Sequence, residues 1–290
     1  MNPSVSSLLQ CPTCRGTLAS HQADFYCVMC DHTYPVVDDR VSFLFLKEKT
    51  LHPSHDRPDS FTVSCKNTFK RFPRFYRLLI AIFGASSGGV SPHAFVKRYV
   101  KPKDILVNLG SGSGERFGEA IHVDLFAFPG VDIIADISHL PFRSNSIDAV
   151  VNLAVLEHVV NPMEVVHEIL RVLKPGGYGY FTTPFMQPYH SSPHDYNRWT
   201  LDGLRALMHD FEEVHGGLRH GSTSALALLF AHWLAVICSF GLERVYDIFL
   251  VGWTMILSPF AHIFDLPLNR LRVSENMASG YFFIVRKPFT

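Results

Sequence analysis

Short apolar runs alternate with amphipathic stretches from Lys101 to the end of the chain. The apolar runs have the length of buried strands, and the stretches between them repeat their apolar residues at helical spacing. This alternation predicts an α/β fold in which helices cover both faces of a mostly parallel sheet. We expect strands at 104–109, 121–124, 131–135, 147–152, 177–182, 210–216 and 280–286, with helices at 91–100, 162–173 and 200–208. The sequence therefore predicts a seven-stranded, doubly wound domain over residues 91–290.

The last two predicted strands are separated by an apolar insertion, residues 222–275. Ser222 to Leu242 is a run of 21 residues without a formal charge, and Ile248 to Phe264 adds 17 more. A helix needs about 20 apolar residues to cross a bilayer, so the first run is long enough and the second is marginal. Because the insertion leaves and re-enters one sheet, we expect an apolar helical hairpin. Such a hairpin could dip into a membrane through residues 222–264, fold over the domain as a lid, or form a dimer surface.

The first 46 residues have a different pattern, in which cysteines and turn residues replace the periodic apolar positions. Two Cys-x-x-Cys pairs are separated by twelve residues. Four thiolates in two tight turns suit one tetrahedral Zn²⁺, and disulfides are not expected in a reducing compartment. A redox dithiol is the alternative interpretation. The sequence predicts a zinc ribbon over residues 1–46, with the metal ligands Cys11, Cys14, Cys27 and Cys30.

Residues 47–90 connect the two predicted units. Up to Asn67 the segment holds prolines and mixed charges without periodicity, as a linker does. From Asn67 to Phe83, apolar side chains recur at spacings of three and four beside arginine and lysine, which predicts a basic amphipathic helix. Nine basic residues and no acidic residue lie between Lys66 and Lys103. Such a segment suits an anionic membrane surface and would equally suit RNA.

Composition narrows the choice of function. Hydrophobic residues make up 47% of the 290, which excludes a disordered or fibrous chain. The 26 basic and 26 acidic side chains cancel, so any nucleic-acid binding must come from a local patch. Met1 to Gln10 shows no secretory signal, so we expect a cytoplasmic protein, either free or anchored by the hairpin at the inner face of the membrane.

A glycine-rich turn follows the first predicted strand of the domain. Gly110 to Gly114 lies where a doubly wound sheet binds ligands, at the carboxyl ends of its strands. Glu115 at the helix entry would repel a pyrophosphate, which disfavours NAD and FAD. Asp124 ends the second strand, where a carboxylate can accept hydrogen bonds from ribose hydroxyls, and Asp136 ends the third, where one can accept from an adenine amine. Together these residues predict a pocket for an adenosine without phosphate, as in S-adenosylmethionine.

The order of these motifs resembles that of the class I S-adenosylmethionine-dependent methyltransferases of the type 11 group, which have a Rossmann-like domain. The resemblance is carried by Asn108 to Gly114, Val123-Asp124, Asp136 with Leu140-Pro-Phe142, Ile147 to His158, and Glu168 to Gly177. It implies an enzyme that transfers a methyl group from S-adenosylmethionine to an acceptor. It also implies a cofactor site formed by Asn108, Gly110, Ser111, Gly112, Gly114, Asp124, Leu125, Asp136, Ile137 and Asn152.

Two features depart from the family pattern. The family usually has Asp or Glu where Asn108 stands, and only six residues separate Gly114 from the second strand, so we expect the usual first helix to be nearly absent. These departures favour, as the alternative function, a non-catalytic methyltransferase-like scaffold that holds a partner through the ribbon and the hairpin.

The ribbon is separately similar to zinc modules of other methyltransferase systems. It resembles the zinc finger of a bacterial rRNA guanine methyltransferase, and the zinc-ribbon subunits that activate tRNA and translation-factor methyltransferases. The shared features are the two cysteine pairs and the Tyr34-Pro-Val sequence that follows them. This resemblance implies RNA or a translation factor as a partner, bound through the ribbon and residues 66–103.

The loop after the fifth strand, residues 184–200, is dense in polar, aromatic and titratable groups. Loops at this edge of the sheet carry substrate contacts, and histidine is the side chain best matched to removing a proton near neutral pH. The candidate catalytic residues are His190, His194 and Asp195. Alternatively, Asp195, Arg198 and Thr200 pair with each other and cap the next helix.

A second catalytic candidate is Glu157-His158, although such a pair more often begins a helix that packs beneath the cofactor. These motifs leave several classes of acceptor open. Loops similar to residues 184–200 occur in methyltransferases of surface-polysaccharide loci. The acceptor is therefore expected to be RNA, or a sugar-linked, lipid-linked or small molecule at a membrane surface.

Overall fold

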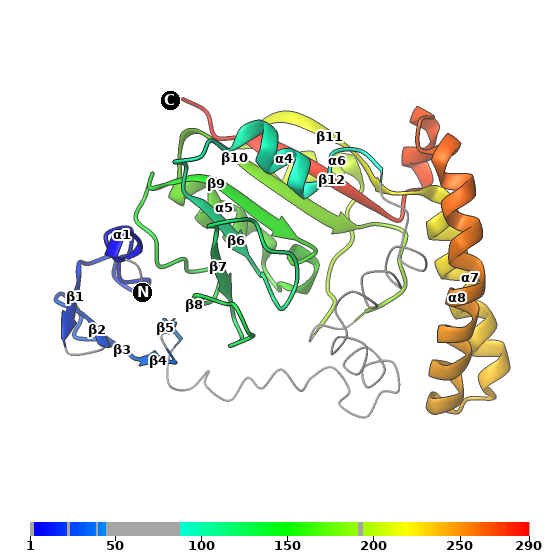
Figure 1. The fold of residues 1–290 in the computed structure, drawn as a ribbon, viewed down its shortest axis with the longest axis horizontal. Coiled ribbons are helices and arrows are strands. Elements are labelled where there is room, and N and C mark those ends of the chain that lie inside the picture. Colours follow the sequence, from blue (N-terminus) through cyan, green and yellow to red (C-terminus); the bar gives the residue numbers. More distant parts are fainter. Residues whose placement is uncertain (1–2, 22–23, 39, 45–87, 191–193, 290) are drawn as a thin grey trace.

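The computed structural model describes residues 3–21, 24–38, 40–44, 88–190 and 194–289 (Figure 1). The predicted linker and the predicted basic helix at Asn67–Phe83 lie outside the described residues. The described chain forms a mixed sheet with helices on both faces and a cysteine-bearing unit at one edge. A two-helix hairpin stands at the end toward which the parallel strands point. The predicted α/β fold is confirmed.

All seven predicted strands are present, in the order β11-β12-β10-β9-β6-β7-β8. Their bounds are β6 Leu106–Leu109, β7 Ile121–Asp124, β8 Ile133–Ile134, β9 Ile147–Leu153, β10 Leu173–Pro184, β11 Glu212–His220 and β12 Gly280–Arg286. β12 pairs antiparallel with β10 and β11, and the pairs among β6 to β10 are parallel. Because parallel strands end at the same edge, the residues that follow β6, β7, β9 and β10 are brought together there.

Helices cover the two faces of this sheet. They are α4 Pro92–Tyr99, the short 3₁₀ helix η2 Leu156–His158, α5 Pro162–Val172 and α6 Leu201–Leu207. α5 and α6 bury Ile169 and Leu204 in the larger apolar cluster. On the opposite face, α4 buries Phe95 in a smaller cluster with Tyr180 and Phe282. The predicted helices at 91–100, 162–173 and 200–208 are therefore confirmed to within two residues.

Five strands differ from their predicted bounds. β6 begins two residues later, β9 ends one residue later, and β11 spans 212–220 rather than 210–216. The larger differences are that β8 is only two residues long and that β10 begins at Leu173, directly after α5. Leu173 pairs with Ile147 before a register shift in the β10–β9 ladder. The Lys-Pro-Gly-Gly sequence that follows explains this shift, because Pro175 has no N–H to donate and Gly176 has a φ of +79°.

The cysteine-bearing unit is continuous with the main sheet. Its elements are α1 Pro3–Ser6, β1 Leu18–His21, β2 Asp24–Cys27, β3 Thr33–Tyr34, β4 Val36–Val37 and β5 Arg40–Ser42. β1, β2 and β3 form a separate three-stranded sheet, whereas β5 pairs in parallel with β8 and carries β4 beside it. Arg15 contacts Glu168 at 3.3 Å, and Cys11 lies in the same apolar cluster as the domain core. Within the predicted ribbon, β4 and β5 thus extend the main sheet to nine strands.

The predicted apolar insertion is a helical hairpin. It consists of α7 Ser222–Ser239, α8 Glu243–Leu268 and the 3₁₀ helix η3 Arg272–Met277. Ser279 N donates to His220 O at 3.0 Å, so the chain leaves and re-enters the sheet at adjacent points. Both α7 and α8 are long and apolar enough to cross a membrane.

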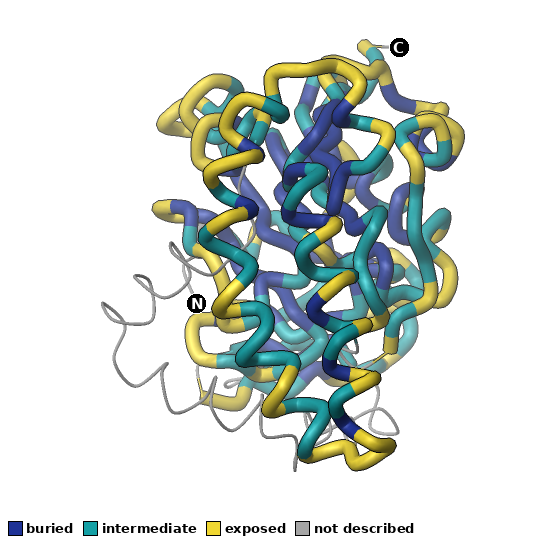
Figure 2. The backbone as a smooth tube through the Cα atoms, turned by 90° about the vertical axis from the view of Figure 1, so that its right-hand side faces the viewer, coloured by how far each residue is buried: buried dark blue, intermediate teal, exposed yellow. Residues whose placement is uncertain are grey.

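The buried positions of the hairpin hold small residues, and its exposed positions hold large apolar residues. Figure 2 shows that buried positions are few along the backbone of the two helices. The buried residues of α7 are Ser224, Ala225, Ala231, Ala235 and Ser239. Leu226, Phe230, Trp233, Ile237 and Phe240 are exposed, at helical spacings of three and four. In the most apolar 18-residue stretch of α8, only 6% of the residues are buried. A helix in the core of a soluble protein buries its large apolar side chains, so the described chain leaves a wide apolar surface uncovered here.

One buried carboxyl ties the two helices together. Asp265, near the end of α8, accepts hydrogen bonds from Thr223 N at 2.7 Å, Ser224 N at 3.0 Å and Ser224 Oγ at 2.6 Å. The N–H groups in the first turn of a helix have no acceptor within that helix. A side chain from α8 therefore caps α7, and Gly221 has no room for a Cβ against it.

We expect Asp265→Ala to destabilise the hairpin. The substitution removes the acceptor of two N–H groups and a hydroxyl, and a buried polar group left without its partner costs about 1–3 kcal/mol. Limited proteolysis measures the effect as new cleavage within residues 219–224. Glu243→Gln, which removes an exposed acid of the same hairpin, should be cleaved like the unsubstituted chain. Identical cleavage of all three proteins would contradict the role of Asp265.

Candidate functional site

The turn after β6 has backbone geometry that favours glycine. Gly110 and Gly112 have φ values of +68° and +49°. A Cβ on Gly110 would collide with the side chain of Val155, which follows β9, whereas a Cβ on Gly112 would meet nothing nearer than 3.9 Å. The N–H groups of Gly110 and Ser111 donate to Val123 O at 2.9 and 3.1 Å. The turn is thus held against the ends of β7 and β9, with open space beside Gly112.

The carboxyl of Asp124 closes this turn. Its Oδ2 accepts from Gly112 N at 2.7 Å, and its Oδ1 accepts from Phe126 N at 2.9 Å. Burial raises the pKa of Asp124, and the backbone donors Phe126, Gly112 and Leu125 oppose that shift. The predicted ribose-binding acid therefore lies at the glycine turn and is oriented by it.

Asp136 follows β8, the strand next to β7. Its Oδ1 accepts from Ser138 N at 2.8 Å, and the next residue, Ile137, is buried. β7 and β8 are parallel, so Asp124 and Asp136 lie at the same edge of the sheet. The arrangement agrees with the predicted pocket, in which one acid binds the ribose and the other binds the adenine; those binding roles stay predictions.

Asn108 lies beneath the glycine turn. It is buried in β6, its Nδ2 donates to Glu115 O at 3.2 Å, and the same atom is 3.3 Å from His122 Nδ1. Burial lowers the pKa of His122, which favours the neutral ring as an acceptor. Asn108 thus supports the segment after the turn from below, and its predicted place beside the methionine end of the cofactor is not tested by these contacts.

Arg116 contacts the glycine turn, which the sequence pattern did not predict. As predicted, no helix forms between Gly114 and β7. Arg116 fills part of that space: its Nη2 donates to Gly112 O at 3.2 Å and to Pro129 O at 2.6 Å. A guanidinium, rather than the first turn of a helix, therefore lies behind the glycine turn.

Three buried polar atoms near the turn have no hydrogen-bond partner among the described residues. Arg116 Nη1 lies behind the turn, and the other two, at the turn itself, are Ser111 Oγ and Asn152 Oδ1. Asn152 is fully buried, and its Nδ2 donates to Leu109 O at 3.3 Å, which turns the side chain toward the end of β6. Buried polar atoms are rarely left unpaired, so these two fit a polar ligand seated on the turn. The residues present therefore fit S-adenosylmethionine.

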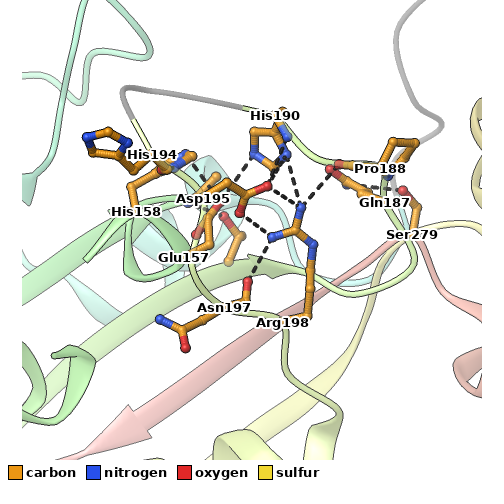
Figure 3. Close-up of polar contacts among 12 residues, drawn as sticks. Glu157, His158, Gln187, Pro188, His190, His194, Asp195, Asn197, Arg198 and Ser279 are labelled. Atoms are coloured by element: carbon orange, nitrogen blue, oxygen red, sulfur yellow. Dashed lines mark hydrogen bonds and ion pairs between the residues drawn. The ribbon is translucent and has the colours of Figure 1, made fainter. Parts of the chain in front are cut away.

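A second cluster lies beside the turn, in the loop after β10 (Figure 3). The Asp195 side chain is 2% exposed and forms a bidentate pair with the Arg198 guanidinium. Arg198 also donates to Pro188 O at 3.1 Å, and Asp195 accepts from His190 N at 2.9 Å. The predicted pairing of Asp195 with Arg198 is confirmed, and Thr200 caps α6 by accepting from Gly203 N at 3.0 Å. Asp195 therefore orders the loop.

His190, His158 and Glu157 face one another across this cluster. Glu157 Oε1 is 3.8 Å from His190 Nε2 and 3.9 Å from His158 Nε2. The Glu157 side chain is fully buried. Glu157 and His158 lie in the three-residue helix η2, whereas the sequence favoured the start of a longer helix. Interaction with Glu157, and then the charge of Asp195, raise the pKa of His190 against the effect of burial.

The structure separates His194 from this group. His158 Nδ1 donates to the backbone oxygen of His194 at 2.5 Å, whereas the residue itself is exposed and its ring lies 5.7 Å from that of Tyr196. Of the three predicted catalytic residues, His190 and Asp195 are therefore side by side, and His194 contributes its main chain. A catalytic role for each of them stays a prediction.

The four cysteines of the N-terminal unit lie together. Cys11 Sγ is 3.6 Å from Cys30 Sγ, Cys14 Sγ is 3.3 Å from Cys27 Sγ, and all four sulfurs lie within 4.8 Å of one another. A tetrahedral ion with Zn–S bonds of 2.3 Å places its sulfurs about 3.8 Å apart. Tyr34 Oη, 3.1 Å from Cys11 Sγ, could donate to a thiolate there. The donor set therefore fits Zn²⁺.

Comparison with known proteins relates part of the sheet domain to methyltransferases. Residues 109–181, which span the glycine turn, Asp124, Asp136 and η2, match the methyltransferase domain family. The chain is also similar over 58 residues, at 41% identity, to a probable S-adenosylmethionine-dependent methyltransferase of Mycolicibacterium smegmatis, a match that covers 20% of this chain and 23% of that protein.

Two further proteins are similar to this chain. MJ0638 of Methanocaldococcus jannaschii is 35% identical over 95 residues, which cover 28% of this chain and 42% of that protein. Phosphoethanolamine N-methyltransferase 2 of Haemonchus contortus, solved with S-adenosyl-L-methionine, is 19% identical with a TM-score of 0.45, over 77% of this chain and 60% of that one. The chain thus spans less than half the length of the two curated relatives.

We expect Asp124→Asn to weaken binding of S-adenosylmethionine about tenfold or more. Asparagine has one acceptor oxygen where aspartate has two, so one of the N–H groups of Gly112 and Phe126 loses its acceptor. A hydrogen bond to a charged acceptor contributes about 1.5–3 kcal/mol. Isothermal calorimetry measures the affinity. Asp132→Asn is the matched control, because Asp132 is exposed and accepts only from His122 N, at 2.8 Å, away from the turn. An affinity unchanged in both variants would contradict the role of Asp124.

Proposed function

We propose that this protein is an S-adenosylmethionine-dependent methyltransferase whose acceptor lies at a membrane surface. The observation that carries the catalytic part is the glycine turn closed by Asp124, with Asp136 at the next strand end and, at the turn, two polar atoms that have no partner among the described residues. The membrane part is supported by the apolar hairpin at the same edge of the sheet.

Different residues at the carboxyl ends of the strands would bind different parts of the cofactor and the acceptor. Bound S-adenosylmethionine supplies a methyl group on a sulfonium, which is an activated leaving group. Asp124 and Leu125 would hold the ribose, Asp136 and Ile137 the adenine, and Gly110, Gly112, Gly114, Ser111, Asn108 and Asn152 the methionine end. Most of the acceleration of such a displacement can come from holding the acceptor in line with the methyl group. The loop at residues 185–198, ordered by Asp195 and Arg198, would hold the acceptor.

The hairpin is joined to that acceptor loop. Phe185 N and Met186 N donate to Ser279 O and Ala278 O, and Gln187 Nε2 donates to Ser279 Oγ at 3.1 Å. β11 runs parallel to β10 and leads directly into α7, so the hairpin starts at the edge that bears the glycine turn. Insertion of the hairpin would bring this edge to the lipid surface. This arrangement favours a lipid-linked or membrane-adsorbed acceptor over RNA.

The packing inside the hairpin supports a lipid environment. Membrane helices approach closely through small residues and turn large apolar residues outward. Ala231, Ala235 and Ser239 follow this pattern at intervals of four on the inner face of α7, with Trp233 and Ile237 on the outer face. We therefore place the protein in the cytoplasm, anchored by its hairpin at the inner face of the membrane.

We also propose that the cysteine cluster binds a structural Zn²⁺. Four thiolates complete a tetrahedral shell and leave no position open for a substrate. Phe43 N donates to Ile134 O at 2.8 Å beside the β5–β8 pair. The ion would thus hold the strand that packs against β8, just before Asp136.

Binding of the cofactor tests the enzyme against a non-catalytic scaffold. We expect saturable, one-to-one binding of S-adenosylmethionine in calorimetry, followed by transfer of labelled methyl groups to the organic extract of added membranes. Absence of binding at about 1 mM cofactor, far above ordinary enzyme affinities, would contradict the enzyme. Label found in the RNA fraction rather than in the organic extract would contradict the membrane acceptor while leaving the enzyme in place.

Flotation with vesicles tests the hairpin. We expect the protein to float with vesicles that contain anionic lipid, and the double variant Trp233→Glu with Ile237→Glu to stay in the soluble fraction, because a charged side chain in the hydrocarbon region costs about 2.5–3.5 kcal/mol. Val214→Glu, which adds a charge at an exposed apolar position on β11, should float like the unsubstituted chain. Equal flotation of all three proteins, or none by the unsubstituted chain, would contradict membrane insertion.

Metal analysis tests the zinc. We expect the Zn²⁺ content to fall by one ion per chain in the double variant Cys14→Ser with Cys27→Ser and to be unchanged in Cys238→Ser, since Cys238 lies in α7 outside the cluster. Loss of the ion should speed amide exchange of Phe43 in the β5–β8 edge, because binding energy at a small metal site contributes to folding. A Zn²⁺ content that does not distinguish the variants would overturn the site.

A further inference from the structure

The group formed by Glu157, His158 and His190 contains a buried carboxyl without a hydrogen-bond donor. Neither oxygen of Glu157 has a hydrogen-bond partner among the described residues, although the residue is fully buried. The nearest nitrogens are His190 Nε2 and His158 Nε2, at 3.8 and 3.9 Å, which is beyond the length of a hydrogen bond. A buried carboxyl is costly unless a cation or donor offsets it. The three side chains therefore surround a position that suits a cation.

The geometry points to a site for a divalent first-row transition metal ion bound by Glu157, His158 and His190, which we propose here. The three ligand atoms lie within 4.8 Å of one another. Around an ion with bonds of about 2.0–2.1 Å, tetrahedral ligands lie roughly 3.4 Å apart. The two distances from Glu157 to the histidine nitrogens would therefore each shorten by about half an ångström on binding. Two imidazoles and one carboxylate are a donor set used for zinc, iron and manganese, and they leave at least one position open.

The hydrogen bonds of His158 prepare it for this role. Its Nδ1 donates to His194 O at 2.5 Å, because a carbonyl can only accept. The proton of the neutral ring is thus on Nδ1, and the lone pair of Nε2 faces Glu157. Metal-binding histidines are commonly fixed in this way, by a backbone carbonyl at the other ring nitrogen.

His190 lies beside a carboxylate and a guanidinium. Its Nδ1 is 3.6 Å from Asp195 Oδ2, beyond the length of a hydrogen bond, and 3.4 Å from Arg198 Nη2. A guanidinium can only donate, so Nδ1 accepts from Arg198 here, and a metal on Nε2 would require the ring proton to lie on Nδ1, where Asp195 Oδ2 is the nearest carboxylate oxygen. Asp195 is in turn held by Arg198, so the carboxylate is oriented before any ion binds. This is the carboxylate–histidine–metal order found around catalytic ions.

Hydrogen bonds join the two segments that carry the proposed metal ligands. Glu157 O accepts from Tyr196 N at 2.7 Å, and Asn197 Nδ2 donates to Val159 O at 3.1 Å. Val155, two residues before Glu157, packs against Gly110 of the cofactor turn. The site is therefore at the same edge as the turn. A metal ion with an open position there would bind an acceptor oxygen and lower the pKa of its proton.

Metal binding is independent of methyl transfer, whereas the use of the ion on an acceptor rests on the proposed function. Mn²⁺ is the probe, because it prefers carboxylate and imidazole to thiolate and so leaves the zinc cluster undisturbed. The protein is used with zinc in place. Free Mn²⁺ is followed by electron paramagnetic resonance, and the Mn²⁺-dependent rise in melting temperature provides a second readout.

We expect the unsubstituted chain and His209→Ala to bind one Mn²⁺. His209 is exposed and lies outside the cluster, which makes it the matched histidine control. Glu157→Gln and His190→Ala should each bind at least about tenfold more weakly and lose the rise in melting temperature. Glu157→Gln keeps the shape of the side chain and removes its charge, so it is the variant best suited to folding normally.

Equal Mn²⁺ binding by all four proteins, or no binding by the unsubstituted chain at about 1 mM, would overturn the site. Calorimetry with S-adenosylmethionine on the same proteins separates this result from a failure of the proposed function. Cofactor binding retained in Glu157→Gln, together with lost Mn²⁺ binding, supports the metal site. Mn²⁺ binding without cofactor binding in the unsubstituted chain would overturn the proposed function alone.

Discussion

The hydrogen bond from Gly112 N to the Asp124 carboxyl is the interaction on which the candidate site depends. It joins the turn after β6 to the end of β7, and it holds Gly112 in a conformation that most side chains would disfavour. With the turn fixed, the unpaired atoms of Ser111 and Asn152 are left at its border. Asp124 is buried and still accepts two backbone N–H groups, so its orientation is set before any ligand arrives.

Sheet topology brings the remaining functional parts to the same place. The parallel strands β6, β7, β9 and β10 end at one edge, which gathers the glycine turn, the two acids, η2 and the loop after β10. β11 adds the hairpin at that edge, and Asp265 caps α7 where it leaves the sheet. At the far side, β5 pairs with β8. In the proposed function, the bound cofactor, the acceptor and the membrane surface therefore lie next to one another at the edge where these strands end.

Local patterns predicted the parts of this structure whose causes are local. β12 matches its predicted bounds because it contains the continuous apolar run Tyr281–Val285, and β7 matches its bounds although it carries His122 and Asp124. The joining of β5 to β8 was not predictable, since it pairs segments about 90 residues apart. The roles of Arg116 and Asp265 were also missed, whereas Glu157 was predicted only as part of a catalytic candidate with His158. Periodicity favours exposed positions for charged residues, and only the folded chain shows that Asp265 caps α7 and that Glu157 is enclosed by two histidines.

Amide hydrogen exchange with and without S-adenosylhomocysteine tests the central claim most directly, because it reports binding residue by residue. The account predicts slower exchange in residues 109–114, 124–126 and 136–138, at the three strand ends that form the pocket, and unchanged exchange in the hairpin helices α7 and α8. Slower exchange confined to other segments, or none at saturating ligand, would contradict a cofactor pocket built on the Asp124–Gly112 contact.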